Sequence, residues 1–156
     1  MLDNSIVEKI RHNISKKIVN GEKKAIIGYS GGSDSRFLVE ILSTIVKDPK
    51  KNLVVCHINY GLRDLESDND QQLVEKICNS LNLNLEIKKY SLSKELKGIQ
   101  EKARKIRMEF FSDLSKKYNT NHCFLGHNIN DQIETIMQNI IRGTGIKGLS
   151  GMKYTN

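Results

Sequence analysis

Short apolar runs and helix-like repeats alternate along the whole chain. Apolar runs at residues 25–27, 53–58 and 122–125, and an alternation of apolar and polar residues at 83–87, are typical of strands. Apolar residues recur at helical spacing at residues 37–45, 73–81, 99–118 and 131–141. This order predicts the α/β class, with a doubly wound, mostly parallel sheet and helices on both faces. The polar residues within 83–87 place that strand nearer the sheet edge.

The chain of 156 residues is interpreted as a single domain, residues 1–156. An amphipathic helix is expected over residues 1–21, with Asp3 or Asn4 as its cap and Gly21 at its end. We assign no chemistry to this helix. In a doubly wound sheet, ligands bind beyond the carboxyl ends of the strands, so the segments that follow the strands are the candidates for chemistry.

The most distinctive of these segments follows the first strand. Ser30-Gly31-Gly32-Ser33-Asp34-Ser35 leads from the strand into a helix, whose N-terminal N–H groups and dipole favour an anion. Gly31 and Gly32 allow close backbone approach, and three hydroxyl groups can add donors. Asp34 would repel a phosphate unless a divalent cation lay between them, so we interpret it as a Mg²⁺ ligand.

Other phosphate-binding patterns do not match this segment. No lysine follows the glycines, as the G-x-x-x-x-G-K-[ST] pattern requires, and the G-x-G-x-x-G spacing is absent. The structural alternative is a plain helix start capped by Ser33 or Asp34, in which the glycines serve only the turn. The position directly after a strand favours phosphate binding.

The segment after the second strand is also polar. His57 is a candidate contact for adenine or another nucleobase, and Arg63 is a candidate phosphate ligand. Gly61 is expected to form a turn, and Ser67 or Asp68 to cap the next helix. We favour this structural interpretation for residues 66–70.

After the fourth strand, Asp131 and Glu134 lie near a predicted helix start, where the dipole stabilises carboxylates, so capping is one explanation. In this fold, however, that helix start is expected beside the 30–35 segment. Asp131 is therefore a candidate to share Mg²⁺ with Asp34 or to accept a proton from an attacking amine.

Two further groups of basic side chains are suited to binding phosphates. Residues 141–152 contain four glycines together with Arg142 and Lys147, although the first glycine also suits the end of a helix. Arg104 and Arg107 share one face of the basic 99–118 helix and can reach an anion beyond the sheet. The neighbouring lysines are interpreted as a solvated face.

The composition indicates which classes of binding partner and cofactor are expected. The net charge of +7 favours a polyanion such as nucleic acid, although a lysine-rich surface also promotes solubility. Cys56, Cys78 and Cys123 are isolated, with no C-x-x-C pair, so neither an iron–sulfur cluster nor a zinc ribbon is indicated, and all three are expected to be reduced and partly buried. No apolar run approaches membrane-spanning length, and we expect a cytoplasmic protein with no membrane partner.

In their order, these segments resemble the catalytic domain of the bacterial tRNA(Ile)-lysidine synthetases, which are N-type ATP pyrophosphatases of the PP-loop superfamily. The matching motifs stand at residues 30–35, 57–63, 101–107, 130–135 and 142–149. The resemblance spans about residues 24–152 and implies a Rossmann-like, adenine nucleotide alpha hydrolase-like fold. Three positions depart from the family pattern: Tyr60 and Asn128 stand where histidine is usual, and Asn130 replaces the first aspartate of an acidic pair.

The resemblance implies a role for each candidate residue. ATP would be bound by Ser30, Gly31, Gly32, Ser33, Asp34, Ser35, His57 and Arg142. Asp34 and Asp131 would hold Mg²⁺, and both would act in catalysis with Arg104 and Arg107. Candidates for contact with the tRNA or its nucleobase are Asn59, Arg63, His127 and Lys147.

The implied reaction is the ATP-dependent ligation of free lysine to C2 of the unmodified wobble cytidine of tRNA(Ile), through an adenylated cytidine. Family members continue past the glycine-rich segment, so we expect the C-terminal tRNA-binding region to be absent here. A second polypeptide that supplies this region and a homodimer are both left open. The alternatives are a truncated or split non-catalytic module that binds ATP or phosphate, and another PP-loop ligase or thiolase.

Overall fold

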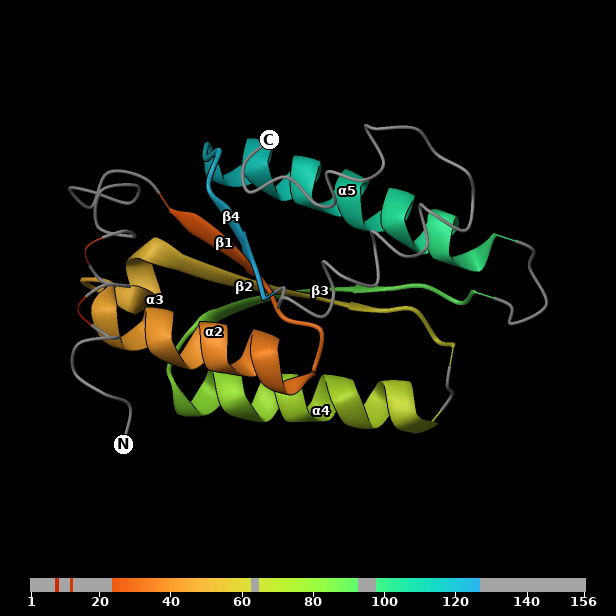
Figure 1. The fold of residues 1–156 in the computed structure, drawn as a ribbon, viewed down its shortest axis with the longest axis horizontal. Helices are drawn as coiled ribbons and strands as arrows, with labels where there is room; N and C mark the ends of the chain where they lie inside the picture. Colours follow the sequence, from red (N-terminus) through yellow and green to blue (C-terminus); the bar gives the residue numbers. More distant parts are fainter. Residues whose placement is uncertain (1–7, 9–11, 13–23, 63–64, 93–97, 127–156) are drawn as a thin grey trace, which may run out of the picture. The chain divides into compact units, whose positions relative to one another are not determined.

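The fold is a parallel sheet covered by helices on both faces (Figure 1). The computed structural model describes residues 8, 12, 24–62, 65–92 and 98–126, which all belong to one compact unit, Met1–Gly126. The helices predicted at residues 1–21 and 131–141 and the glycine-rich 141–152 segment lie outside the described residues, apart from Glu8 and His12. None of the described helices is both long and apolar enough to cross a bilayer.

The predicted alternation of strands and helices is confirmed from β1 to β4. The elements are β1 (Ala25–Gly28), α2 (Ser33–Ile45), α3 (Pro49–Asn52), β2 (Leu53–Asn59), α4 (Leu65–Ser80), β3 (Asn84–Lys89), α5 (Ile99–Tyr118) and β4 (Cys123–Leu125). The sequence pattern missed α3, because four residues are too few to show a helical repeat.

The strand order is β3-β2-β1-β4, and every pair is parallel. The central strand β1 places Ile27 opposite Val55 of β2 and Phe124 of β4. The strand β3 lies at the edge, as predicted. The chain runs from β1 towards β2 on one side and returns to β4 on the other, so β1 is the point at which the strand order reverses.

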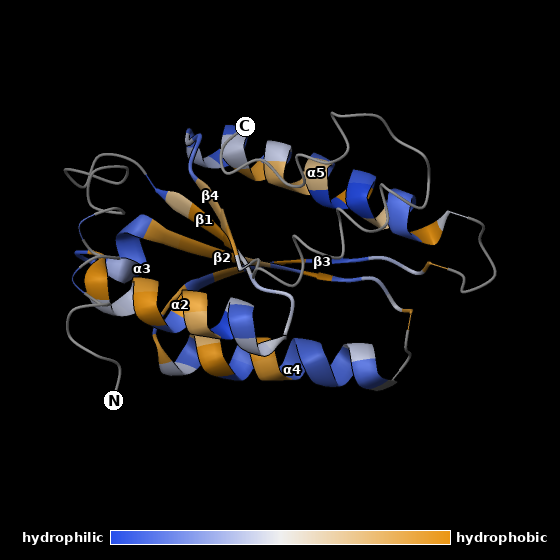
Figure 2. Ribbon diagram, viewed as in Figure 1, coloured by the Kyte–Doolittle hydropathy of each residue, from blue (hydrophilic) through white to orange (hydrophobic). Residues whose placement is uncertain are grey.

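Two hydrophobic cores lie on the two faces of the sheet. Alternate residues Ala25, Ile27, Leu53 and Val55 pack with buried residues of α2 and α4, whereas Ile26 and Cys56 pack with α5. In Figure 1, α5 accordingly covers one face and α2 and α4 cover the other. Figure 2 shows β1 and β2 largely in hydrophobic colours, and the apolar residues of these two strands are buried. This alternation follows from the two-residue period of a strand.

Three local predictions are corrected. The N-cap of α2 is Gly32, not Ser33 or Asp34, because the helix starts at Ser33. Likewise α4 begins at Leu65, so Ser67 and Asp68 lie in its first turn and cannot cap it. Among the three unpaired cysteines, Cys56 and Cys78 are buried, as expected, but Cys123 on the edge strand β4 is exposed.

Candidate functional site

The connection from β1 to α2 forms the centre of the candidate site. We call its four residues, Tyr29–Gly32, the β1–α2 loop. Gly31 has φ of +97°, a conformation that residues with a Cβ rarely adopt. Gly32 is the N-cap of α2, and within the described residues no side-chain cap hydrogen bond occupies the first-turn N–H groups. These groups point outward from the helix start, and such an arrangement suits an anion.

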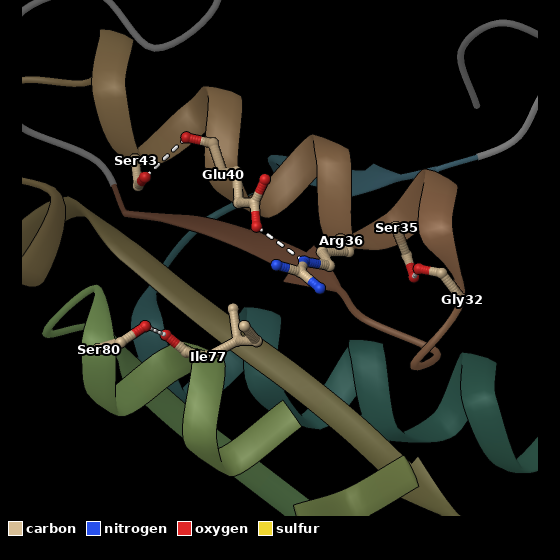
Figure 3. A network of polar contacts seen from close by, with 7 residues as sticks. All are labelled: Gly32, Ser35, Arg36, Glu40, Ser43, Ile77 and Ser80. Atoms are coloured by element: carbon tan, nitrogen blue, oxygen red, sulfur yellow. Dashed lines mark hydrogen bonds and ion pairs between the residues drawn. The ribbon is translucent and has the colours of Figure 1, made fainter. Parts of the chain in front are cut away.

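Two serine hydroxyls brace this loop from within. The hydroxyl of Ser35 donates a 2.9 Å hydrogen bond to the carbonyl of Gly32 (Figure 3). Its oxygen also accepts from the N–H of Ser30 at 3.2 Å and lies 3.0 Å from the hydroxyl of Ser30. Because the single hydroxyl proton of Ser35 is used on Gly32, Ser30 is the donor in the last pair. Of the three predicted hydroxyls, therefore, Ser30 and Ser35 shape the loop, while Ser33 is exposed.

A glycine at the end of β4 brings this strand against the start of α2. A Cβ on Gly126 would lie 2.9 Å from the carbonyl carbon and oxygen of Asp34 and 2.9 Å from the Cα of Ser35. Neighbouring backbone fills this space, so only glycine fits there. Sequence reasoning did not identify this packing, although a glycine directly after a strand is a usual sign of close backbone approach.

His57 supports the β1–α2 loop from the neighbouring strand. Its side chain is 97% buried, because its relative exposure is 3%. A carbonyl oxygen can only accept, so the 2.8 Å contact with Tyr29 assigns the proton to Nδ1 of His57. Nε2 is buried, and none of the described residues gives it a hydrogen-bond partner. The structure therefore favours a role for His57 in positioning the loop, and the predicted contact with a nucleobase stays a prediction.

The side-chain amide of Asn59, a predicted nucleobase contact, is hydrogen-bonded to neighbouring residues. Its amide nitrogen donates to Asp68 at 3.0 Å and to Gln71 at 3.1 Å. Its amide oxygen accepts from the N–H of Gly61 at 3.0 Å. Asn59 is 5% exposed, so it ties the end of β2 to α4 and to the following turn. Contact between Asn59 and a nucleobase would require some of these bonds to be exchanged.

Tyr60 connects the end of β2 to α5. Its hydroxyl donates a 3.2 Å hydrogen bond to the carbonyl of Ala103, one helical turn before Arg107. Burial raises the pKa of Tyr60, while the positive charge of Arg107 opposes this shift. The half-buried Arg107 therefore lies near the carboxyl end of β2, whereas Arg104 is exposed.

Two carboxylates belong to the site. Asp34 is exposed in the first turn of α2. Asp70 of α4 lies against the loop, because a Cβ on Gly31 would be 3.3 Å from its Cβ and Cγ and 3.5 Å from its Oδ1. Sequence reasoning assigned Asp70 to a helix start, since its place depends on how α4 crosses the loop. Within the described residues, no group of three or more His, Cys, Asp or Glu forms a ready metal site.

The remaining candidates lie outside the described residues. They are Arg63, His127, Asp131, Arg142 and Lys147, together with the variant positions Asn128 and Asn130. Their predicted roles stay predictions. The site that the structure does describe consists of the β1–α2 loop, the start of α2, and the side chains that hold or flank them from β2, α4 and β4.

A family model described as a PP-loop domain matches residues 2–156. Among curated proteins, the chain is 35% identical over 154 residues to the tRNA(Ile)-lysidine synthase of Clostridioides difficile (strain 630), covering 96% of this chain and 33% of that protein. It is 42% identical over 146 residues to the synthase of Mycoplasma mycoides subsp. mycoides, covering 86% of this chain and 35% of the relative. The chain thus spans about a third of the length of these relatives.

Solved structures share the fold at lower sequence identity. The U34-tRNA thiolase NcsA from Methanococcus maripaludis, described with its [4Fe-4S] cluster, has a TM-score of 0.72 and 21% identity, covering 90% of this chain and 51% of that one. The NH3-dependent NAD synthetase from Campylobacter jejuni has a TM-score of 0.60 and 16% identity, with coverage of 94% and 76%. At these identities the likeness concerns the fold alone, which agrees with the doubly wound sheet.

Proposed function

Because this chain belongs to the PP-loop domain family, we propose that it binds ATP at the β1–α2 loop and uses it to activate the wobble cytidine of an isoleucine tRNA for ligation to lysine. Family membership implies ATP binding. The observation that carries the proposal is the loop at the strand-order reversal, where Gly31 and the N-cap Gly32 lead directly into the first turn of α2. The 35% identity to a lysidine synthase over 96% of this chain supports the choice of tRNA and lysine.

The proposed chemistry has two steps. The C2 oxygen of cytidine attacks the α-phosphate of ATP, and the bond from that phosphorus to the pyrophosphate oxygen breaks. The lysine amine then bonds to C2 and loses a proton, and the C2–oxygen bond breaks to release AMP. The N–H groups at the start of α2 would bind the leaving pyrophosphate, while Arg104 and Arg107 would balance the remaining negative charge. Asp131 is proposed to accept the amine proton.

The carboxylates fit the Mg²⁺ that the family chemistry implies. Asp34 is an exposed oxygen donor in the first turn of α2, and carboxylate oxygens are ligands that Mg²⁺ prefers. Asp34 would hold the ion, with Asp131 as the proposed second ligand. When bound, Mg²⁺ supplies charge neutralisation to the phosphates.

The remaining basic side chains are proposed to contact nucleic acid and phosphate. Arg63, His127 and Lys147 are proposed to contact the tRNA, and Arg142 the ATP phosphates. The net charge of +7 supports a polyanionic partner.

The test is pyrophosphate release from ATP with Mg²⁺ and lysine, in the presence and absence of isoleucine tRNA that carries an unmodified wobble cytidine. We expect release that requires this tRNA and fails when guanosine replaces the wobble cytidine. Asp34→Asn should reduce the rate by about a hundredfold or more, because it weakens the site for the ion that neutralises the phosphates. The matched control is Asp113→Asn on α5, since Asp113 is 63% exposed and pairs only with Lys88 at the surface within the described residues.

The other outcomes identify the alternatives. ATP binding without release under any condition would indicate a non-catalytic module. If activity appeared only after a second polypeptide was added, a split enzyme would be established, and size measurement of the active species would detect a homodimer. Release that does not need tRNA would indicate a PP-loop enzyme that acts on a small molecule. Full activity of Asp34→Asn would contradict the assigned role of Asp34.

A further inference from the structure

The β1–α2 loop carries a carboxylate that the proposed reaction has not used. Asp70 belongs to the second turn of α4, and its side chain packs on Gly31, where a Cβ would lie 3.3 Å from its Cγ. Gly31 is the residue of the loop with the left-handed conformation, at φ of +97°. The contact therefore joins α4 to the residue of the loop whose backbone conformation favours glycine.

Asp70 differs from its polar neighbours in the sequence of α4. Asp68 accepts a hydrogen bond from Asn59, and Gln71 donates one to Glu75. Among the described residues, no hydrogen bond or ion pair ties down the half-buried carboxylate of Asp70. Its packing on the loop is thus not explained by a partner in α4, β2 or the loop.

A lone carboxylate in this place has a definite electrostatic effect. It repels a nucleoside triphosphate that has no bound cation, and it attracts the complex in which a divalent cation accompanies the phosphates. Mg²⁺ in phosphate sites typically has one or two carboxylates, several waters and the phosphate oxygens as ligands. Asp34 is the first carboxylate at this site, and the contact with Gly31 makes Asp70 a second one.

We propose that Asp70 is a specificity-determining residue that makes the β1–α2 loop accept ATP only together with a divalent cation. The proposal rests on the proposed function, because it requires ATP to bind at this loop. Asp70 acts by its charge beside Gly31, so replacing the carboxylate with the isosteric amide has opposite effects on the two forms of ATP. Affinity for metal-free ATP rises, and affinity for Mg-ATP falls.

The test measures the dissociation constant of ATP by calorimetry with excess Mg²⁺ and with excess chelator, for the full chain and two variants. We expect the ratio of the metal-free to the Mg²⁺ value to fall about five- to tenfold in Asp70→Asn. It should not change in Asp113→Asn, which removes the same charge from α5.

A purely structural role of Asp70 gives a different result. Distortion of the loop would weaken both forms of ATP alike, so an unchanged ratio in Asp70→Asn overturns the inference whatever the affinities. If the unmodified chain binds ATP and only the expected change in ratio is missing, the proposed function stands without this inference. If the unmodified chain binds no ATP in either condition, both are wrong.

Discussion

The Nδ1–H of His57 donates a 2.8 Å hydrogen bond to the carbonyl oxygen of Tyr29 and so joins β2 to the first residue of the β1–α2 loop. Both residues are buried, at 3% and 2% exposure. A hydrogen bond in such surroundings is costly to lose, because water cannot replace the missing partner. The position of the loop relative to the sheet therefore depends on an imidazole two residues before the end of β2.

Replacing His57 should loosen the β1–α2 loop. His57→Leu removes the donor to Tyr29, and we expect the free energy of unfolding to fall by about 1–3 kcal/mol, measured by urea denaturation. His57→Asn places an amide N–H near the position of Nδ1 and should retain part of this stability. Equal stability of the leucine variant and the unmodified chain would show that the hydrogen bond does not hold the loop.

The hydroxyl of Ser35 should contribute more than an ordinary helix hydroxyl. Ser35→Ala removes its bonds to Gly32 and Ser30, so we expect a loss of about 1–2 kcal/mol in unfolding free energy. ATP affinity, measured by calorimetry, should fall as well. The control is Ser43→Ala, which removes a 2.7 Å bond to the carbonyl of Glu40 in the same helix, away from the loop (Figure 3). Equal effects of the two variants would contradict the assigned role.

Gly126 should not tolerate a methyl group. In Gly126→Ala the added carbon would lie 2.9 Å from the backbone of Asp34, which cannot move aside as a side chain can. We expect destabilisation of about 1–3 kcal/mol in a thermal or urea melt. Gly32→Ser is the comparison, since a Cβ there would lie 3.6 Å from the Ser30 hydroxyl, an ordinary contact, and serine is a favoured N-cap. If the alanine variant were as stable as this comparison, β4 would not pack on α2 as described.

Glu86 should make stability depend on pH in the acid range. Burial raises the pKa of Glu86, but hydrogen bonds from Lys117, at 2.7 Å, and from Tyr118 lower it by more than burial raises it. The pKa of Glu86 is therefore below its ordinary value. The ionised Glu86 therefore contributes its full stabilisation above the pKa that this carboxyl has in the unfolded chain. That contribution is lost as the pH falls through the lower pKa that Glu86 has in the folded protein.

Glu86→Gln should thus be less stable than the unmodified chain at pH 7, and the difference should shrink towards pH 3. Urea midpoints at several pH values measure this trend. The control is Glu109→Gln, which removes a carboxylate from an exposed position of α5. A difference that grows as pH falls would contradict the sign of the shift.

Much of this fold could be predicted because its signals are local. The apolar runs of β1 and β2 and the helical repeat of α5 each lie within about twenty neighbouring residues, and periodicity alone distinguishes them. The Ser-Gly-Gly-Ser-Asp-Ser segment was identified from its residue types and from its place directly after a strand. What failed was local detail at element ends, as with the cap of α2 and the start of α4, where several polar residues compete for one position.

The sequence by itself determined the α/β class, the parallel sheet and the segment that turns from β1 into α2, because residue types a few positions apart dictate strand, turn and helix. Only the tertiary structure decided which side chains meet there. Asp70 packs on Gly31, His57 bonds to Tyr29, and Gly126 fits against Asp34, across 39, 28 and 92 positions of sequence. These pairings follow from strand order and helix crossing, which no local pattern encodes, so the site's charge and rigidity appear only once the sheet has assembled.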